Sequence, residues 1–226
     1  IINNSSNSYG GGCYFEGDGE NNGQEWINPE LILINNSSIT NNTTKLRGAG
    51  LYISEANLRL VHSKITYNVQ SVNQGGNEGG GIYFGHGTLV LNNNLINNNT
   101  AADGAGIRTY HADVLADGNN ISDNYSYGEA GGWSNNGYEN DTLKISNHVF
   151  SENFAQTSGG GGLALGSSTF IMDNSHILNN TGTFGGGIYV KSGKNTFNNV
   201  LISNNHSTTR SGGGIHLYNG TVTINN

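Results

Sequence analysis

The chain has 226 residues, of which 36 are Gly, one is Pro and 11% are charged. Its formal net charge is −7 and its nine Lys and Arg residues are scattered singly, so it offers no electrostatic footprint for nucleic acid. No run of about 18 apolar residues occurs, so we expect no membrane-spanning helix, and with a single Cys, Cys13, an internal disulfide is excluded.

A glycine-rich hexapeptide recurs along the whole chain. Each copy has three small residues, mostly Gly, then an inward apolar residue, a variable outward residue and, in most copies, a second apolar residue. Self-similarity at a period of about 20 to 50 residues is typical of a solenoid. Cys13 takes the inward position of the first copy, where we expect a small buried hydrophobe. The copies span residues 10–15, 48–53, 79–84, 104–109, 130–135, 159–165, 185–190 and 212–217.

A second motif lies between the glycine copies, an apolar residue followed three positions later by Asn. It runs from Ile39 and Asn42 to Ile202 and Asn205. Three positions before each apolar residue stands another Asn or a near equivalent. We expect both columns to form stacked amide ladders along the solenoid axis, with one residue per turn about 4.8 Å apart. The second column comprises Asn36, His62, Asn93, Gly118, Asn147, Asn174 and Asn199.

The segments between these motifs alternate apolar and polar residues with period two, and no segment has a helical period. The chain is therefore predicted to be an all-β solenoid of about eight turns, with three short strands per turn. The apolar fraction of 34% suits a narrow core column. We expect one domain over residues 1–226, with insertions at 16–31, 69–78 and 137–142, and a narrow pocket beside each inward strand that only Gly or Ala fits.

The repeats resemble those of right-handed, single-stranded parallel β-helices of the pectate-lyase-like superfamily. The residues Phe150-Ser151-Glu152-Asn153, followed by Gly160-Gly161-Gly162-Leu163, look like the polymorphic outer-membrane protein repeat of autotransporter passengers. The likeness covers nearly the whole chain, although most copies have Ile in place of Phe and Gly in place of Ala. It implies a secreted or cell-surface location and a structural or adhesin function.

An outward column follows the glycines and is rich in Tyr. Aromatic faces at the strand spacing could stack on sugar rings; alternatively, these tyrosines are exposed strand residues that pack on each other. The column is Tyr14, Tyr52, Tyr83, Arg108, Ser134, Ala164, Tyr189 and His216, and Tyr110 and Tyr218 follow two positions after Arg108 and His216. The candidate carbohydrate-binding residues are the tyrosines of this set: Tyr14, Tyr52, Tyr83, Tyr110, Tyr189 and Tyr218.

Three carboxylates precede the inward residue of successive strands by four positions: Glu78, Asp103 and Glu129. If the register holds, they stack about 5 Å apart, where like charges raise one another's pKa or bind a cation. The family resemblance implies Ca²⁺ as that cation and a lyase or hydrolase activity, with Arg108 and His111 as further candidates. Alternatively, the acids are solvated loop residues and no cofactor is required.

The sequence is compatible with two functions. The first is an extracellular structural or adhesin module, or a fibre or filament subunit, whose face binds polysaccharide or cell-surface glycans. The second is a polysaccharide lyase or glycoside hydrolase. Both ends stop within a turn without a cap, which is typical of a piece of a longer protein or of a subunit that associates end to end.

Overall fold

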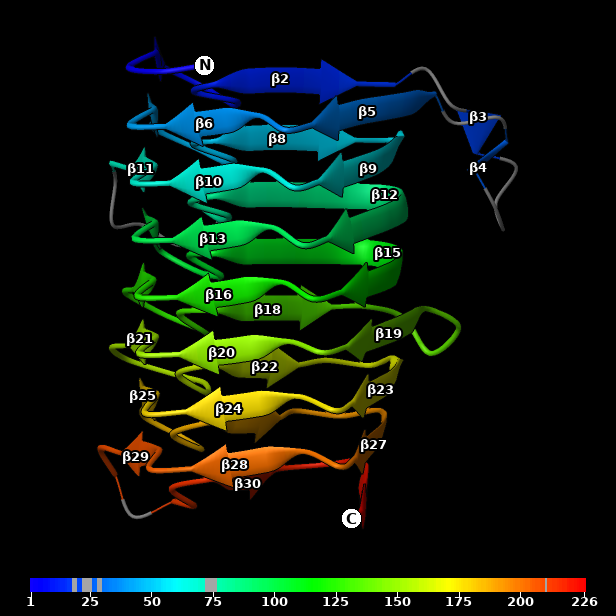
Figure 1. Cartoon of the computed structure of the whole chain (residues 1–226), viewed down its shortest axis with the longest axis vertical. Coiled ribbons are helices and arrows are strands. Elements are labelled where there is room, and N and C mark those ends of the chain that lie inside the picture. The colour runs from blue at the N-terminus through cyan, green and yellow to red at the C-terminus, as the bar shows by residue number, and fades with distance from the viewer. Residues whose placement is uncertain (18–19, 22–25, 28–29, 72–76, 210) are drawn as a thin grey trace.

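In a computed structural model the chain is a parallel β-solenoid of about seven turns (Figure 1). The structure describes residues 1–17, 20–21, 26–27, 30–71, 77–209 and 211–226. Every strand pair but one is parallel, and three sheets run along the axis. The all-β prediction is confirmed, with about seven turns in place of eight. Among the described residues no helix has the length and apolarity to cross a membrane.

We name the sheets large, middle and narrow. The large sheet contains β2 (Cys13–Glu16), β5 (Leu31–Asn35), β8 (Leu51–Ser54), β9 (Asn57–Val61), β12 (Ile82–Asn92), β15 (Ile107–Asp117), β18 (Trp133–Asn136), β19 (Thr142–Ser146), β22 (Leu163–Leu165), β23 (Thr169–Asp173), β26 (Ile188–Val190), β27 (Lys194–Asn198), β30 (Ile215–Leu217) and β31 (Thr221–Asn225). In most turns it holds two successive strands, which merge into one in β12 and β15.

The middle sheet follows in each turn. It contains β6 (Ser38–Thr40), β10 (Lys64–Thr66), β13 (Leu95–Asn97), β16 (Asn120–Ser122), β20 (Val149–Ser151), β24 (His176–Leu178) and β28 (Leu201–Ser203). The narrow sheet closes the turn with β1 (Ser5–Ser6), β7 (Thr43–Thr44), β11 (Val69–Gln70), β14 (Thr100–Ala101), β17 (Tyr125–Ser126), β21 (Phe154–Ala155), β25 (Thr181–Gly182) and β29 (His206–Ser207).

The core is a column of inward side chains stacked in register. Ile82 pairs with Leu51 on one side and with Ile107 on the other, and all three are fully buried. The Gly or Ala two positions earlier also faces inward. A Cβ added at Gly80 would lie 2.6 Å from the carbonyl oxygen of Thr100, so the backbone of the next turn leaves no room for a larger side chain. Both expectations about this segment are confirmed.

The first predicted Asn column is a continuous ladder. Asn99 Oδ1 accepts hydrogen bonds from the backbone N–H and the Nδ2 of Asn68, each at 3.0 Å. Its own Nδ2 donates to Ile65 O at 2.9 Å and to Asn124 Oδ1 at 3.0 Å. Only an amide offers both the acceptor and the donors that this buried corner needs. The same pattern repeats from Asn42 to Asn205.

The second predicted ladder is wrong. The side chains of Asn36, His62 and Asn93 are exposed, and the whole column has φ between 46° and 64°, so it is a left-handed turn position. Asn and Gly are the residues that tolerate this conformation best, which explains their enrichment there. The inward position is the next residue, where a mixed set of side chains accepts hydrogen bonds from the preceding turn: Ser63, Asn94, Asn119, His148 and Ser175.

The predicted insertions lie at corners of the coil. Within 16–31, β3 (Glu20–Asn21) and β4 (Trp26–Ile27) form a short antiparallel pair beside the coil (Figure 1). Residues 72–76, half of the 69–78 insertion, lie outside the described residues, and β11 occupies its start. The 137–142 insertion is a turn between β18 and β19. Cys13 is half-buried and packs against the core, and burial raises the pKa of its thiol.

Candidate functional face on the large sheet

The outward column of the glycine-following strands is in register from one end of the coil to the other. Tyr14 pairs with Tyr52, and Tyr52 with Tyr83. The column then continues through Arg108, Ser134, Ala164, Tyr189 and His216. The predicted alignment of these residues is therefore correct, and the question is what each side chain contacts.

The first three tyrosines form a parallel stack. The ring centroids of Tyr14 and Tyr52 are 5.0 Å apart with an interplanar angle of 5°, and those of Tyr52 and Tyr83 are 5.1 Å apart at 4°. Tyr9 lies 4.8 Å from Tyr52. The exposed fraction falls from 46% at Tyr14 to 8% at Tyr52 and 5% at Tyr83. The faces of the two inner rings are covered by neighbours, so they cannot receive a sugar ring.

Arg47 covers the far end of this stack. Its guanidinium carbon lies 5.1 Å from the centroid of the Tyr83 ring, within the range of a cation–π contact. Burial of Tyr83 raises the pKa of its hydroxyl to about 12 despite the nearby Arg47 charge. The aromatic stack thus passes directly into a group of charged side chains.

The three predicted carboxylates do lie on successive turns. Gly79 N donates to Asp103 O at 3.0 Å and Gly104 N donates to Glu129 O at 2.8 Å, which fixes their backbone register, and Glu78 pairs with Asp103 as an isolated parallel bridge. The same slot one turn earlier holds Arg47, since Gly48 N donates to Glu78 O. The column of the three carboxylates is therefore preceded, one turn earlier, by the positively charged Arg47.

Arginine and lysine side chains neutralise these carboxylates. Arg108 Nη2 is 3.0 Å from Glu78 Oε1, and its Nη1 is 3.8 Å from Glu129 Oε2. Arg47 Nε is 3.4 Å from Glu78 Oε2, and Lys191 Nζ is 2.8 Å from Glu129 Oε2. Arg108 also donates to Ser134 Oγ. Positive and negative side chains thus alternate along the axis. We call this group the ion-pair network: Arg47, Glu78, Arg108, Glu129 and Lys191.

Asp103 has a different environment. Its Oδ1 accepts the backbone N–H of Glu129 at 2.7 Å, and burial raises the pKa of the carboxyl. Among the described residues, no group of three or more His, Cys, Asp or Glu side chains is arranged to hold a metal ion. Ca²⁺ binding by Glu78, Asp103 and Glu129 remains a prediction, and the cations of the ion-pair network would compete with it.

His111 belongs to a separate aromatic cluster at the corner between the two segments of β15. His86 occupies the same position on the previous turn, with ring centroids 5.4 Å apart, and Tyr110 contacts His111 edge-on at 3.9 Å. The ring of Tyr138, from the 137–142 insertion, stacks on His111. Burial lowers the pKa of His111 to about 4, so its imidazole is neutral at pH 7, 3.8 Å from Asp141. Arg108 and His111 therefore belong to separate groups of contacts.

The C-terminal part of the outward column is an open aromatic patch, which we call the aromatic patch. Tyr189 and His216 lie 5.5 Å apart, and Phe184 lies 5.8 Å from Tyr189 and 5.9 Å from His216. These rings are tilted by 38° to 42°, so they leave faces uncovered, and Phe184 is 36% exposed. Tyr218 next to this strand is 76% exposed.

Sequence reasoning missed three members of these groups. Arg47 was recognisable, because it precedes its glycine copy in the same slot as Glu78, and Phe184 takes that slot before Gly185. Lys191 gave no such signal, since its side chain reaches Glu129 two turns away along the axis.

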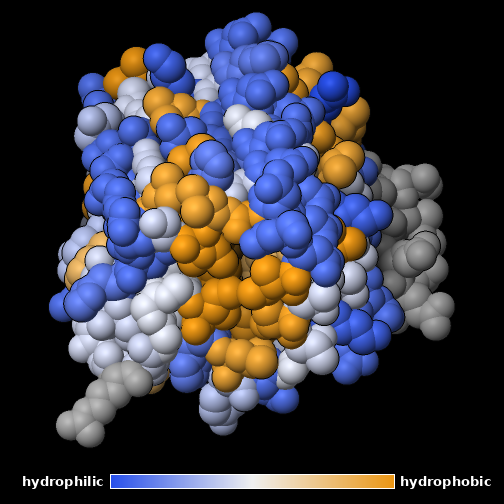
Figure 2. Space-filling model, turned by 60° about the horizontal axis from the view of Figure 1, so that its bottom comes forward, coloured by the Kyte–Doolittle hydropathy of each residue, from blue (hydrophilic) through white to orange (hydrophobic). Residues whose placement is uncertain are grey.

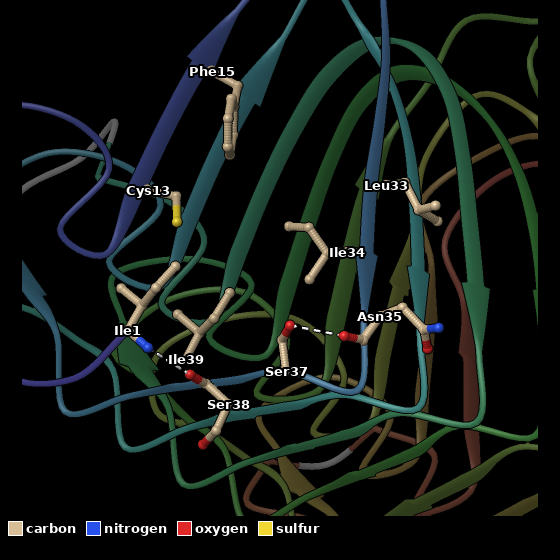
Figure 3. Close-up of a pocket in the computed structure, with 9 residues that line it drawn as sticks. All are labelled: Ile1, Cys13, Phe15, Leu33, Ile34, Asn35, Ser37, Ser38 and Ile39. Atoms are coloured by element: carbon tan, nitrogen blue, oxygen red, sulfur yellow. Dashed lines mark hydrogen bonds between the residues drawn. The ribbon is translucent and has the colours of Figure 1, made fainter.

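A cavity of about 470 Å³ opens at the N-terminal end of the core (Figure 3). Cys13, Ile34 and Ile39 point into it, with Ile1, Phe15 and Leu33 at its rim, and its polar atoms are few: Ser37 Oγ donates to Asn35 O at 2.9 Å. At the opposite end, Figure 2 shows a patch of apolar surface. In the last two strands, Leu217 of β30 and Ile224 of β31 are exposed. Both surfaces are ends of the core column, and the first is lined by the Cys13 thiol and by Ile1, whose N-terminal ammonium donates to Ser38 O at 2.9 Å.

Comparison with protein-family models, with curated proteins and with solved structures finds no match for the chain.

Proposed function

We propose that the chain is an extracellular or cell-surface β-solenoid module whose aromatic patch binds carbohydrate. The observation that carries this proposal is the mutual tilt of three rings on a rigid strand repeat, those of the exposed Phe184 and of the half-buried Tyr189 and His216. Uncovered aromatic faces offer apolar contact area at low entropic cost, and the C–H faces of a pyranose ring suit them. The resemblance to autotransporter passenger repeats supports the surface location.

The surroundings of the aromatic patch favour an uncharged glycan. Lys191 and Glu129, the charged side chains beside Tyr189, form an ion pair with each other at 2.8 Å, so neither presents an unbalanced charge. Hydroxyl groups of a sugar could exchange hydrogen bonds with the exposed Tyr218. The buried rings of Tyr52 and Tyr83 are excluded from this contact, so the proposal narrows the Tyr column to its C-terminal part.

The test is a glycan array probed with the purified chain, followed by titration calorimetry with any oligosaccharide that binds. Tyr189→Ala should weaken binding about tenfold, equivalent to about 1.4 kcal/mol. Tyr67→Ala is the matched control, because Tyr67 is an exposed tyrosine outside the large sheet. If the folded wild type binds no glycan, or if both variants bind equally well, carbohydrate recognition by the aromatic patch must be abandoned.

The second candidate is a polysaccharide lyase or glycoside hydrolase that uses the carboxylates Glu78, Asp103 and Glu129. One observation favours it: Asp103 is a half-buried carboxyl, and burial raises its pKa although the Arg108 charge acts in the opposite direction; a raised carboxyl pKa is typical of a general acid. Cleavage of a polysaccharide by the wild type and its loss in Asp103→Asn would support this candidate. Activity that persists in Asp103→Asn would remove this carboxyl from the reaction.

Association through the ends is a further prediction. Large apolar side chains are exposed there, with Leu33 at 65% and Ile224 at 55%. Apolar strand edges promote pairing with other chains. Light scattering over a concentration series, with electron microscopy of the same samples, would detect filaments; a constant monomer mass would count against a fibre subunit.

A further inference from the structure

The parallel stack of Tyr14, Tyr52 and Tyr83 does not take part in the proposed glycan contact. Its rings lie 5.0 and 5.1 Å apart and nearly parallel, so they overlap as π systems along the axis. Tyr14 is the accessible end of the stack and Tyr52 is buried behind it. An electron removed from the Tyr52 ring can therefore be supplied by a ring in contact with it, either Tyr14 at 5.0 Å or Tyr9 at 4.8 Å.

A proton acceptor accompanies the accessible ring. The hydroxyl of Tyr14 donates a hydrogen bond to the Glu16 carboxylate, the last residue of the same strand. Oxidation of a phenol makes its proton strongly acidic, so a carboxylate already bonded to that proton accepts it without rearrangement. This hydrogen bond is also the largest cause of the raised pKa of Tyr14, about 12, which keeps the phenol protonated until it is oxidised.

We propose that Tyr14 and Tyr52 are a site of oxidative dityrosine formation, in which a peroxidase with hydrogen peroxide joins two successive turns of the coil. Each phenol loses one electron and its hydroxyl proton to give a phenoxyl radical. The two radicals form a carbon–carbon bond between their ortho positions, and the ring hydrogens at these positions return to the oxygens as protons. The two electrons and two protons reduce one hydrogen peroxide to two water molecules.

The geometry selects this pair over the other exposed tyrosines. Tyr67, Tyr138 and Tyr218 are 55%, 62% and 76% exposed, but among the described residues none of them stacks on another tyrosine, so each could couple only with a second molecule. Tyr9 also stacks on Tyr52, but its ring is tilted by 30° whereas that of Tyr14 lies within 5° of it. Tyr83 has a stacked neighbour but lies under Arg47, whose positive charge opposes loss of an electron. Tyr14 with Tyr52 combines access, stacking and a proton acceptor.

The experiment treats the purified chain, at a concentration low enough to suppress contact between molecules, with horseradish peroxidase and limiting hydrogen peroxide. Intact mass and dityrosine fluorescence are recorded, and a digest is searched for a cross-linked peptide pair. We expect a monomer that has lost two hydrogen atoms and a peptide pair that contains Tyr14 and Tyr52. The product should unfold at a higher denaturant concentration, because the link restricts the unfolded chain.

Three variants decide the assignment. Tyr14→Phe and Tyr52→Phe should each abolish the monomeric cross-link while circular dichroism stays that of the wild type, and Tyr218→Phe should leave its yield unchanged. Glu16→Gln should slow the reaction, since the acceptor for the phenol proton is lost. The proposal fails if Tyr14→Phe retains the monomeric product, or if all dityrosine is found between molecules.

Discussion

The outward column of the large sheet divides into two halves that share one backbone repeat. In the closed half, the rings of Tyr14, Tyr52 and Tyr83 stack on one another, and Arg108 is buried in ion pairs with its neighbours. In the open half, Ala164 is too small to reach its neighbours, and the rings of Tyr189 and His216 meet at 42°. Position in the repeat therefore sets only the direction of a side chain. The neighbouring side chains decide whether that side chain is covered by packing or stays accessible to solvent.

The largest effect should come from Arg108→Met, which breaks the closed half. The Arg108 side chain is 8% exposed and compensates both Glu78 and Glu129. The variant removes the most buried of the three cations and leaves Glu78 and Glu129 with the more exposed Arg47 and Lys191 as their partners, so we expect a loss of up to about 3 kcal/mol in the free energy of unfolding. Urea denaturation measures it. Arg59→Met, at an exposed arginine of the same sheet, should change stability by less than about 0.5 kcal/mol; equal losses in the two variants would contradict the assigned role.

Alkaline pH should also act on the closed half, through Tyr83. Burial raises the pKa of its hydroxyl to about 12, above the usual value of 10, so between these pH values the unfolded chain loses the proton first. Stability is fully present below pH 10 and falls as pH rises towards 12, by up to about 3 kcal/mol for this residue. Unfolding of the wild type and Tyr83→Phe at pH 9 and pH 11.5 isolates the contribution, since the phenylalanine variant lacks it. An identical pH dependence in the two proteins would refute it.

Lys191→Met tests the boundary between the two halves. The Lys191 side chain is 23% exposed, and its ammonium lies 2.8 Å from Glu129, which retains Arg108 as a second partner. We expect a loss of about 0.5 kcal/mol, typical of a partly exposed ion pair. The loss should shrink at high salt, because screening weakens such pairs. A loss that persists in 1 M NaCl would mean that the lysine stem contributes by packing instead.

The fold was predictable from the sequence because two positions per turn tolerate few residues. The pocket beside Gly80 excludes large side chains, and the ladder position of Asn99 requires both donor and acceptor atoms. The second Asn column was misinterpreted because Asn has two physical uses, in buried amide ladders and in left-handed turns. The presence of His62 and Gly118 in that column was the available clue, since neither carries an amide side chain.

The site was predictable only in part. Register placed Glu78, Asp103 and Glu129 on successive turns as expected, because backbone hydrogen bonds fix that alignment. The partners of these carboxylates depend on long side chains whose direction the repeat does not determine. Lys191 reaches across two turns. Likewise, the repeat predicts that Tyr52 and Tyr189 point outward, but not that one is covered by parallel rings and the other lies among tilted ones.

His216→Tyr should have the smallest effect, because it introduces into the open half the tyrosine stacking that is found in the closed half. His216 pairs in register with Tyr189 on the outer strands β26 and β30. A tyrosine there should stack on Tyr189 and stabilise the fold by about 0.5 kcal/mol, the scale of a cross-strand aromatic pair. It should also cover one face of Tyr189 and weaken glycan binding in the calorimetric assay. If stability rises while binding is unchanged, the uncovered face of Tyr189 is not the surface that the glycan contacts, and Phe184 becomes the residue to substitute.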